Sequence, residues 1–277
     1  MSKRKPSRNT QFIKKNSNDY EALNEEKYKK SLKRSGLNLK MREKIVHEVG
    51  GIENYFSTKD LHKATYKAIL KHSKLYAANY NIKQAIYNLG PTGYPFEILC
   101  AQMLEAKGYK TKVSCMVRGV NVRHEVDVIA QRDDQNIYCE CKFHSQKLSK
   151  NNIKVPLYVH SRYLDIKDAN PHLTFKYALF SNTDFSKDAI KYAKGVDLLL
   201  YSMNYPKKDT FCNIIKKYKV YPVSVLKSLR VKDFKALLDN KIVVIKQVKR
   251  SDLENLGLKP IQITKVLQEI KVLTRPS

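Results

Sequence analysis

The chain is poor in acidic residues and contains no long apolar segment. Twenty-six aspartates and glutamates stand against 53 lysines and arginines, which gives a formal net charge of +27. No apolar run is long enough to span a bilayer, and the lysine-rich start lacks the apolar stretch of a signal peptide. These absences weigh against a membrane-spanning protein and a secreted one, so we expect a cytoplasmic address and no membrane partner.

The positive charge is spread over the whole length of the chain and predicts a polyanionic partner. Each phosphate that a lysine or arginine neutralises releases counterions, and this release drives association. The composition therefore favours a protein that binds nucleic acid.

Cysteine is scarce, and its five copies have no disulfide-like spacing. An odd number of cysteines fits a reducing compartment. The pair Cys139 and Cys141 raises the alternative of a zinc site. Strand alternation places both thiols on a buried face, and no second Cys or His pair stands at a suitable distance, so core packing is favoured over metal.

The most informative segment has the sequence HEVDVIAQRDDQNIYCECKF. Residues 124–130 and 136–143 have the composition of β-strands, and the polar residues between them predict a hairpin turn. Because side chains alternate along a strand, the polar residues of the two strands should share one face. The residues expected on that face are Glu125, Asp127, Glu140 and Lys142.

Two carboxylates on one small patch suit a hard divalent cation. Mg²⁺ or Mn²⁺ takes one or two carboxylates and completes its shell with water and substrate phosphate. Asp127 and Glu140 would be the ligands, and Lys142 would hold or help deprotonate the attacking water. This arrangement predicts phosphodiester hydrolysis. The alternative is a plain surface ion pair on an exposed hairpin.

A further acidic candidate, Glu97, precedes the hairpin in a segment with helical spacing, PFEILCAQMLEAKGY. Pro95 fits the first turn of that helix. Glu97 in the same turn either complements the helix dipole or serves as a second-metal or water-mediated ligand.

A helix with a glutamate followed by strands carrying D…ExK resembles the PD-(D/E)XK restriction-endonuclease-like superfamily. Asp127, Glu140 and Lys142 match its core motif. The resemblance implies a mixed sheet flanked by helices, Mg²⁺-dependent cleavage of DNA, and a metal shell completed by the backbone carbonyl of Cys141. A strand at 174–180, a helix at 185–193 and a strand at 196–202 are expected downstream.

Residues 12–90 begin with FIKKNSNDYEALNEEKYKKSLKRSGL, which resembles the opening of an ATP-cone domain. Lys14 and Lys15 occupy the position of its basic pair, and Lys27 that of its helical lysine. The resemblance implies ATP or dATP as a regulator. The turn carries Asn16, Ser17 and Asn18 in place of the usual glycine, and Asn79 stands where an arginine is common. The alternative is a helical DNA-binding or dimerisation domain with a solvated basic face.

The motif GPTGYP, residues 90–95, marks a domain boundary. The joined pattern resembles a bacterial family of ATP-cone proteins with a restriction-endonuclease domain. The match continues through HEVDV, ECKFH, VPLYVHSRYLDI and FSNTDFSKDAIKYA.

Several side chains near the hairpin are suited to contact a phosphate backbone. His124 and His144 flank the predicted site, and Arg162 and Tyr163 follow it. Arg162 would either clamp a phosphate or form a buried ion pair with Asp165.

Beyond residue 205 the chain is basic and helical in pattern. Residues 256–259, LGLK, faintly resemble the hairpin of a helix-hairpin-helix element. The alternative is an ordinary helical corner, stopped by Gly257 and restarted near Pro260.

Together these patterns predict an α/β fold, α+β overall, with a helical ATP-cone-like domain, a mixed-sheet nuclease core and a helical extension. The expected segments are a basic tail at 1–11 and domains at 12–90, 91–205 and 206–277. The expected function is a metal-dependent endodeoxyribonuclease, gated by nucleotide and serving defence against foreign DNA. Because one such centre normally cuts one strand, a homodimer would account for double-strand cleavage. The alternatives are a non-catalytic nucleic-acid-binding regulator and an RNA-processing nuclease.

Overall fold

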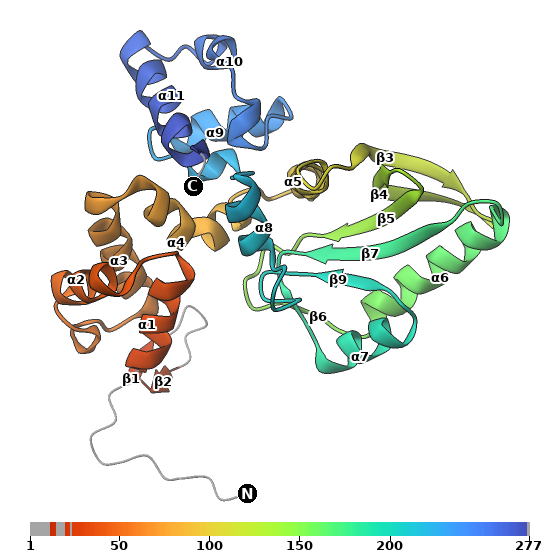
Figure 1. Cartoon of the computed structure of the whole chain (residues 1–277), viewed down its shortest axis with the longest axis horizontal. Coiled ribbons are helices and arrows are strands. Elements are labelled where there is room, and N and C mark those ends of the chain that lie inside the picture. The colour runs from red at the N-terminus through yellow and green to blue at the C-terminus, as the bar shows by residue number, and fades with distance from the viewer. Residues whose placement is uncertain (1–11, 15–19, 23, 276–277) are drawn as a thin grey trace, which may run out of the picture. The chain divides into compact units, whose positions relative to one another are not determined.

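The computed structural model describes residues 12–14, 20–22 and 24–275 of the chain (Figure 1). The chain divides into two compact units, residues 1–81 and 82–277. The tail predicted at residues 1–11 and the basic-pair residue Lys15 lie outside the described residues. The domain boundary expected at residue 90 stays a prediction.

The first unit opens with a short hairpin and continues as helices. Strand β1 pairs antiparallel with β2. The elements are β1 (Phe12–Lys14), β2 (Tyr20–Ala22), α1 (Glu25–Arg34), α2 (Leu39–Val49), a 3-10 turn (Ile52–Asn54), α3 (Thr58–His72) and the start of α4 (Lys74–Tyr87).

Polar caps and an apolar stripe explain these helices. Asn24, Asn38 and Ser57 each accept a hydrogen bond from the backbone N–H three residues on, which satisfies a free donor of α1, α2 and α3. On the inner faces, Leu32 and Ile45 are completely buried. The first unit is therefore a small helical bundle with its own apolar core.

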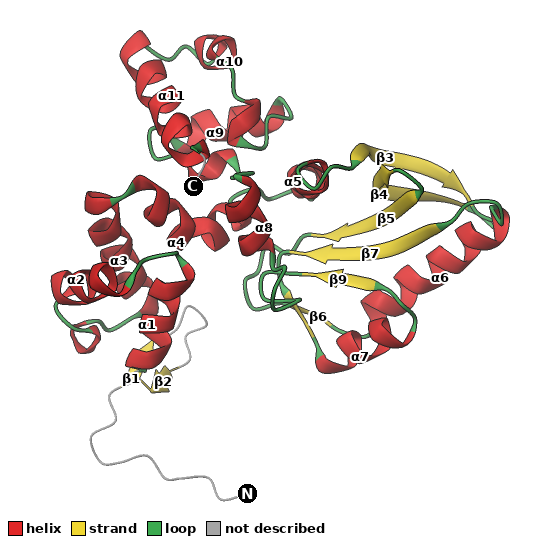
Figure 2. Cartoon of the chain, in the orientation of Figure 1, coloured by secondary structure: helices red, strands yellow, loops and turns green. Residues whose placement is uncertain are grey.

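The second unit is built on a five-stranded mixed sheet of order β3-β4-β5-β7-β9 (Figure 2). Strands β3, β4 and β5 are antiparallel neighbours, whereas β5, β7 and β9 pair in parallel. The strands are β3 (Lys110–Arg118), β4 (Arg123–Arg132), β5 (Gln135–Lys142), β7 (Phe175–Ser181) and β9 (Leu199–Tyr201). The predicted mixed sheet is confirmed.

Helices cover both faces of this sheet. Helices α6 and α7 lie along one face (Figure 1), and α5 packs against β3, β4 and β5 from the other. The bounds are α5 (Tyr94–Glu105), α6 (Lys154–Ala169) and α7 (Lys187–Gly195), with a small parallel pair formed by β6 (Lys150–Asn151) and β8 (Asp184–Phe185). Since β5 and β7 run parallel, the chain needs the crossover that α6 provides.

The side-chain alternation predicted for β5 holds in the structure. Cys139 and Cys141 are buried on the face that meets Cys100 of α5. Glu140 points to the opposite face and meets α6. Strand β3, which the sequence did not reveal, adds an outer neighbour to the predicted β4–β5 hairpin.

The chain after β9 is helical, as expected. It forms α8 (Phe211–Tyr218), α9 (Val231–Asp239), α10 (Arg250–Asn255) and α11 (Pro260–Thr274), with 3-10 turns at Val223–Val225 and Ile245–Gln247. Gly257 adopts a φ of +68° between α10 and α11, which agrees with the predicted stop at Gly257 and restart near Pro260.

A search of the described helices finds none that is both long enough and apolar enough to cross a membrane.

Candidate active site

Asp127 and Glu140 lie close together where the paired part of β4 and β5 ends. The last paired residues are Val128 and Cys139, and Asp127 and Glu140 come next on the two strands. Their proximity is marked by the charge of Glu140, which contributes to the raised pKa of Asp127. The backbone N–H of Cys141 donates a 2.6 Å hydrogen bond to Oδ2 of Asp127. The predicted carboxylate pair is therefore assembled by strand register.

Two side chains of α6 hold the Glu140 carboxylate. The hydroxyl of Tyr158 donates to Oε1 at 2.7 Å, and the Arg162 guanidinium forms an ion pair with Oε2. Tyr158 and Arg162 are one helical turn apart, so their side chains reach the same carboxylate. Arg162 also donates to the backbone carbonyl of Glu125 at 3.2 Å, which anchors the guanidinium between β4 and β5.

Burial and crowding of negative charge perturb this cluster. Burial, followed by the charge of Glu140, raises the pKa of Asp127 to about 7. Burial, followed by the charges of Glu125 and Glu140, raises the pKa of Glu97 in α5. The carboxylates thus sit close enough together to oppose one another's ionisation. A cation placed among them would relieve that repulsion.

The donor set suits a hard oxygen-binding cation. In the described part of the chain, no three His, Cys, Asp or Glu side chains form a ready metal-binding group. Mg²⁺ needs only one or two protein carboxylates, and Asp127, Glu140 and the Cys141 carbonyl supply oxygen ligands of that kind. These residues therefore fit Mg²⁺ or Mn²⁺.

The thiols of the cysteine pair are buried on the α5 side of the sheet, next to Asp127. Cys139 and Cys141 are free and buried, and burial raises the pKa of both thiols well above the ordinary value. A zinc ligand must be a thiolate, which this apolar setting disfavours. The expectation of core packing agrees with these positions.

The remaining motif residue, Lys142, is at the exposed end of β5. His144 follows in the next loop, where its backbone N–H donates to Asn182 Oδ1 at 2.8 Å and its Nε2 lies 2.9 Å from Asn151 Oδ1. The buried amides of Asn151 and Asn182 thus fix the orientation of His144. DNA contact by His144 stays a prediction.

The alternative of an Arg162–Asp165 ion pair is wrong. Arg162 pairs with Glu140, and Asp165 instead meets His124, whose Nε2 lies 2.7 Å from Oδ2. This hydrogen bond from His124 is the main reason that the pKa of Asp165 is lowered to about 2. The pairing was open in the sequence because residues three apart on a helix can both face the sheet.

Tyr163 packs against the apolar core on the α6 side of the sheet. Its ring centroid is 5.3 Å from that of Phe175 and 5.6 Å from that of Tyr177. This position gives Tyr163 a packing role, and its predicted contact with DNA is untested.

The residues predicted to bind nucleotide belong to the first unit. Lys14 ends β1 and is exposed, and its backbone N–H donates to the Phe56 carbonyl at 2.9 Å. Lys27 is exposed in the first turn of α1, where its N–H donates to Asn24 at 2.8 Å. Lys14 therefore lies in the hairpin and Lys27 in the helix that follows it, in the order that the sequence predicts.

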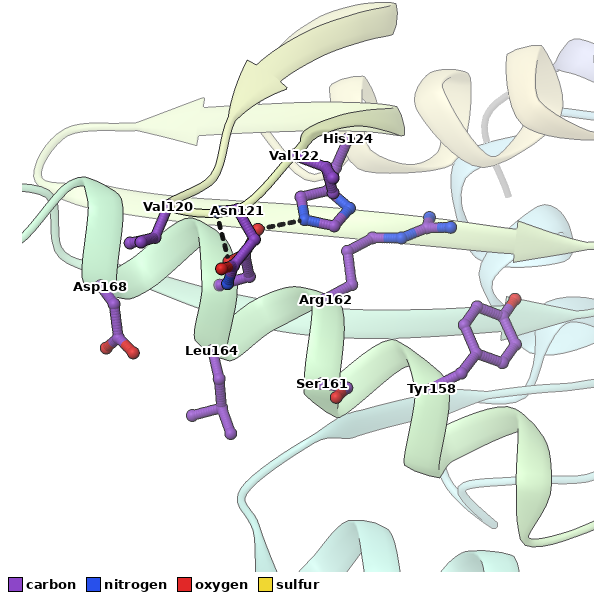
Figure 3. A pocket seen from close by; sticks show the side chains of 10 residues that line it. Val120, Asn121, Val122, His124, Tyr158, Ser161, Arg162, Leu164 and Asp168 are labelled. Atoms are coloured by element: carbon purple, nitrogen blue, oxygen red, sulfur yellow. Dashed lines mark hydrogen bonds and ion pairs between the residues drawn. The ribbon is translucent and has the colours of Figure 1, made fainter.

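A hollow of about 560 Å³ lies between the β3–β4 connection and α6 (Figure 3). Arg162 and Tyr158, the two partners of Glu140, form one end of its lining. The tip of the β3–β4 hairpin forms another part, and Figure 3 shows Val120, Asn121 and Val122 above α6. We call the four residues 119–122 the hairpin tip.

The sequence did not reveal the hairpin tip or the anchoring role of Tyr158. A signal for the tip exists in RGVNVR, residues 118–123, because glycine and asparagine are typical turn residues and here they separate two strand-like segments. The role of Tyr158 depends on docking of α6 onto β5, which no local pattern encodes.

Comparisons with known proteins define the class of this domain. Residues 91–204 match the family model described as Restriction endonuclease, and residues 221–274 match the one described as AF1548-like, C-terminal. The segment 91–204 is therefore a restriction-endonuclease-like domain, as the superfamily resemblance implied.

The chain is also similar to individual archaeal and structurally determined proteins. It is 34% identical over 127 residues to an uncharacterized protein of Archaeoglobus fulgidus, covering 46% of this chain and 71% of that protein. It resembles the crystal structure of AF1548, a protein of unknown function, with a TM-score of 0.55 and 29% identity, covering 66% of this chain and 98% of that one. The chain belongs to the family of this Archaeoglobus fulgidus protein.

Proposed function

We propose that the protein is a metal-dependent endonuclease that hydrolyses phosphodiester bonds in DNA. The observation that carries this proposal is the close pair Asp127 and Glu140 in a restriction-endonuclease-like domain. Asp127 is partly buried and Glu140 is buried. The pKa of Asp127 is raised to about 7 because burial and then the charge of Glu140 oppose its ionisation, a perturbation that is common at functional sites.

The carboxylates Asp127 and Glu140 and the backbone carbonyl of Cys141 would hold Mg²⁺ or Mn²⁺. When bound there, the ion would polarise the scissile phosphate and stabilise the leaving oxygen. Lys142 would orient the attacking water and help remove its proton. Glu97, at the edge of the carboxylate cluster, would orient a water molecule or bind a second ion.

DNA is the proposed substrate because the chain is strongly basic along its length. Arg162 pairs with Glu140, and His124 and His144 flank the predicted site in the sequence; we propose that all three contact backbone phosphates. Arg162 would have to share its guanidinium between Glu140 and a phosphate. Restriction or defence against foreign DNA is the biological setting that we propose for this activity.

The test is cleavage of supercoiled plasmid with Mg²⁺ or Mn²⁺ and with EDTA. Asp127→Ala and Glu140→Ala should abolish metal-dependent nicking while DNA binding is kept. Intact plasmid with tight binding, across both metals and with added ATP, would contradict the proposal and favour a non-catalytic regulator. Equal cleavage of RNA and DNA would instead favour an RNA-processing enzyme.

Regulation by ATP or dATP is a separate proposal for the first unit. Its support is the resemblance of residues 12–90 to an ATP-cone and the order of hairpin, Asn24 cap and Lys27 helix. Lys14, Lys15 and Lys27 would contact the phosphates. Calorimetry with ATP and dATP, together with the oligomeric state measured by light scattering, tests both the nucleotide effector and the proposed homodimer. No heat of binding and no change in mass would contradict it.

A further inference from the structure

The hairpin tip exposes apolar side chains on the hollow that Arg162 and Tyr158 also line. Val120 is 62% exposed and Val122 is 58% exposed. Leu164 of α6, 42% exposed, lines the same hollow. Apolar groups left open next to a functional site commonly mark a contact surface.

The tip is held rigidly although it is exposed. The Asp165 carboxylate accepts hydrogen bonds from the backbone N–H and the side-chain amide of Asn121, and the Asp165 carbonyl accepts one from the Val120 N–H at 3.2 Å. Asn170 donates to the Arg118 carbonyl at 2.9 Å. Asp165 of α6 therefore fixes the middle of the tip, and Asn170, the residue that caps the end of α6, fixes the last residue of β3 before it.

Glycine is required where the tip approaches α6. A Cβ atom at Gly119 would lie 1.9 Å from Oδ2 of Asp165 and 2.7 Å from the Val122 carbonyl. Because Asp165 is also engaged by His124, it has little freedom to move away. The absence of a side chain at Gly119 thus lets the tip lie against α6.

Positive charge borders the apolar tip. Arg118 and Arg123 are partners across the end of the β3–β4 ladder, and both are exposed. Arg162 lies at the opposite end of the hollow, where it also contacts Glu140. An apolar tip between arginines complements a DNA groove, which has phosphates at its rims and, where a base step opens, apolar base faces that accept an inserted side chain.

We propose that the hairpin tip is a preformed wedge that enters a groove of duplex DNA, with Val120 and Val122 against the bases and Arg118 and Arg123 on the flanking phosphates. This inference rests on the proposed function and adds the element that positions the duplex over Glu140. Because the tip is already ordered, binding loses little conformational entropy. With the wedge in the groove, the duplex would lie along the hollow towards Arg162 and Tyr158, the two partners of Glu140.

The test measures binding of a short fluorescein-labelled duplex of mixed sequence by anisotropy, in EDTA, over a range of salt concentrations. The double variant Val120→Ser/Val122→Ser should bind at least about tenfold more weakly, since burial of one valine is worth about that factor. The salt dependence of its affinity should stay unchanged, because no charge is lost. Arg118→Gln/Arg123→Gln should instead reduce that salt dependence.

Gly119→Ala tests the same wedge by a second route, since its methyl group displaces the tip without removing the valines. It should lose a similar factor in affinity and reduce bending of the duplex, measured by energy transfer between its labelled ends. Leu39→Ser, at a residue of the first unit that is 61% exposed, is the matched control and should bind as the wild type does. Circular dichroism checks that each variant is folded.

Wild-type affinity in both folded tip variants would overturn the wedge, as would a changed salt dependence in the valine variant. Because these measurements contain no metal and require no cleavage, they are independent of the catalytic proposal. A protein that binds through the wedge and never cuts would refute the nuclease and leave the wedge intact.

Discussion

Arg162 of the crossover helix α6 forms an ion pair with Glu140 of β5, the glutamate that the D…ExK pattern predicts as a metal ligand. The side chains are 25% and 11% exposed, respectively. The positive charge of one residue therefore occupies the carboxylate that a metal ion would need. This competition makes the pair sensitive to substitution in two measurable ways.

Arg162→Ala should destabilise the protein by about 1–3 kcal/mol, because it leaves a poorly solvated carboxylate with one fewer donor. Denaturant unfolding of Arg162→Ala, Glu140→Gln and the double variant gives the coupling between the two residues. If the two effects simply add, the ion pair contributes nothing to stability.

Arg162→Ala should also bind Mn²⁺ more tightly than the wild type when DNA is absent, since no guanidinium competes for Glu140. Calorimetric titration of the purified protein measures this. The same variant should cleave DNA more slowly because it lacks the proposed phosphate contact. A Mn²⁺ affinity equal to or below that of the wild type would show that Arg162 does not oppose the metal.

The raised pKa of Asp127 predicts a pH-dependent stability. The folded-state pKa of about 7 exceeds the ordinary aspartate value of about 3.9, so the folded protein binds the proton more strongly than the unfolded chain. The contribution of Asp127 to the free energy of unfolding is therefore fully present below about pH 4 and is lost as the pH rises through 7.

Asp127→Asn should consequently melt close to the wild type at pH 4 and at a higher temperature than the wild type at pH 8, both in EDTA. Calorimetric melting across this pH range provides the measurement. Asp134→Asn, in the exposed turn between β4 and β5, is the control and should show no such trend. A constant difference in melting temperature across the pH range would contradict a raised pKa of Asp127 in the folded protein.

Lys142→Gln should reduce cleavage at least about 10²-fold, the usual contribution of a group that transfers a proton. Its effect on unfolding should stay within about 0.5 kcal/mol, because Lys142 is exposed. Lys112→Gln removes another exposed lysine, on β3, and should leave the cleavage rate unchanged. Undiminished cleavage in Lys142→Gln would remove this lysine from the mechanism.

Native alkylation should separate the cysteines by position. Cys100, Cys139 and Cys141 are buried with raised pKa values, so iodoacetamide should leave them unmodified in the folded protein. Cys115 and Cys212 are only partly buried and should react first. Mass spectrometry of the alkylated peptides identifies the sites, and rapid labelling of Cys139 or Cys141 would contradict the buried strand face.

Local patterns predicted the parts of the site that neighbours in sequence build. The β4–β5 hairpin, α5 with Pro95 in its first turn, and α7 with Ser186 as its cap all agree with the sequence expectations. In each case a short-range rule, such as alternation or capping, acts on residues close together in the chain.

The parts that escaped prediction depend on distant segments. Asp165 and Glu140 were both available to Arg162, and only the docking of α6 onto β5 decides between them. Strand β3 was missed because its exposure alternates between intermediate and exposed, so it lacks a strongly apolar face. Long-range packing and weak patterning, respectively, account for these two failures.

The parallel pairing of β5 with β7 has a consequence for synthesis of the chain. The β4–β5 hairpin can close once residue 142 has emerged, but both donors to Glu140 come from α6, which is made afterwards. Non-local parallel pairing also forms slowly compared with a hairpin. A nascent chain therefore carries Asp127 and Glu140 as neighbouring carboxylates before Arg162 can pair with Glu140, and we expect this ion pair to form late in folding.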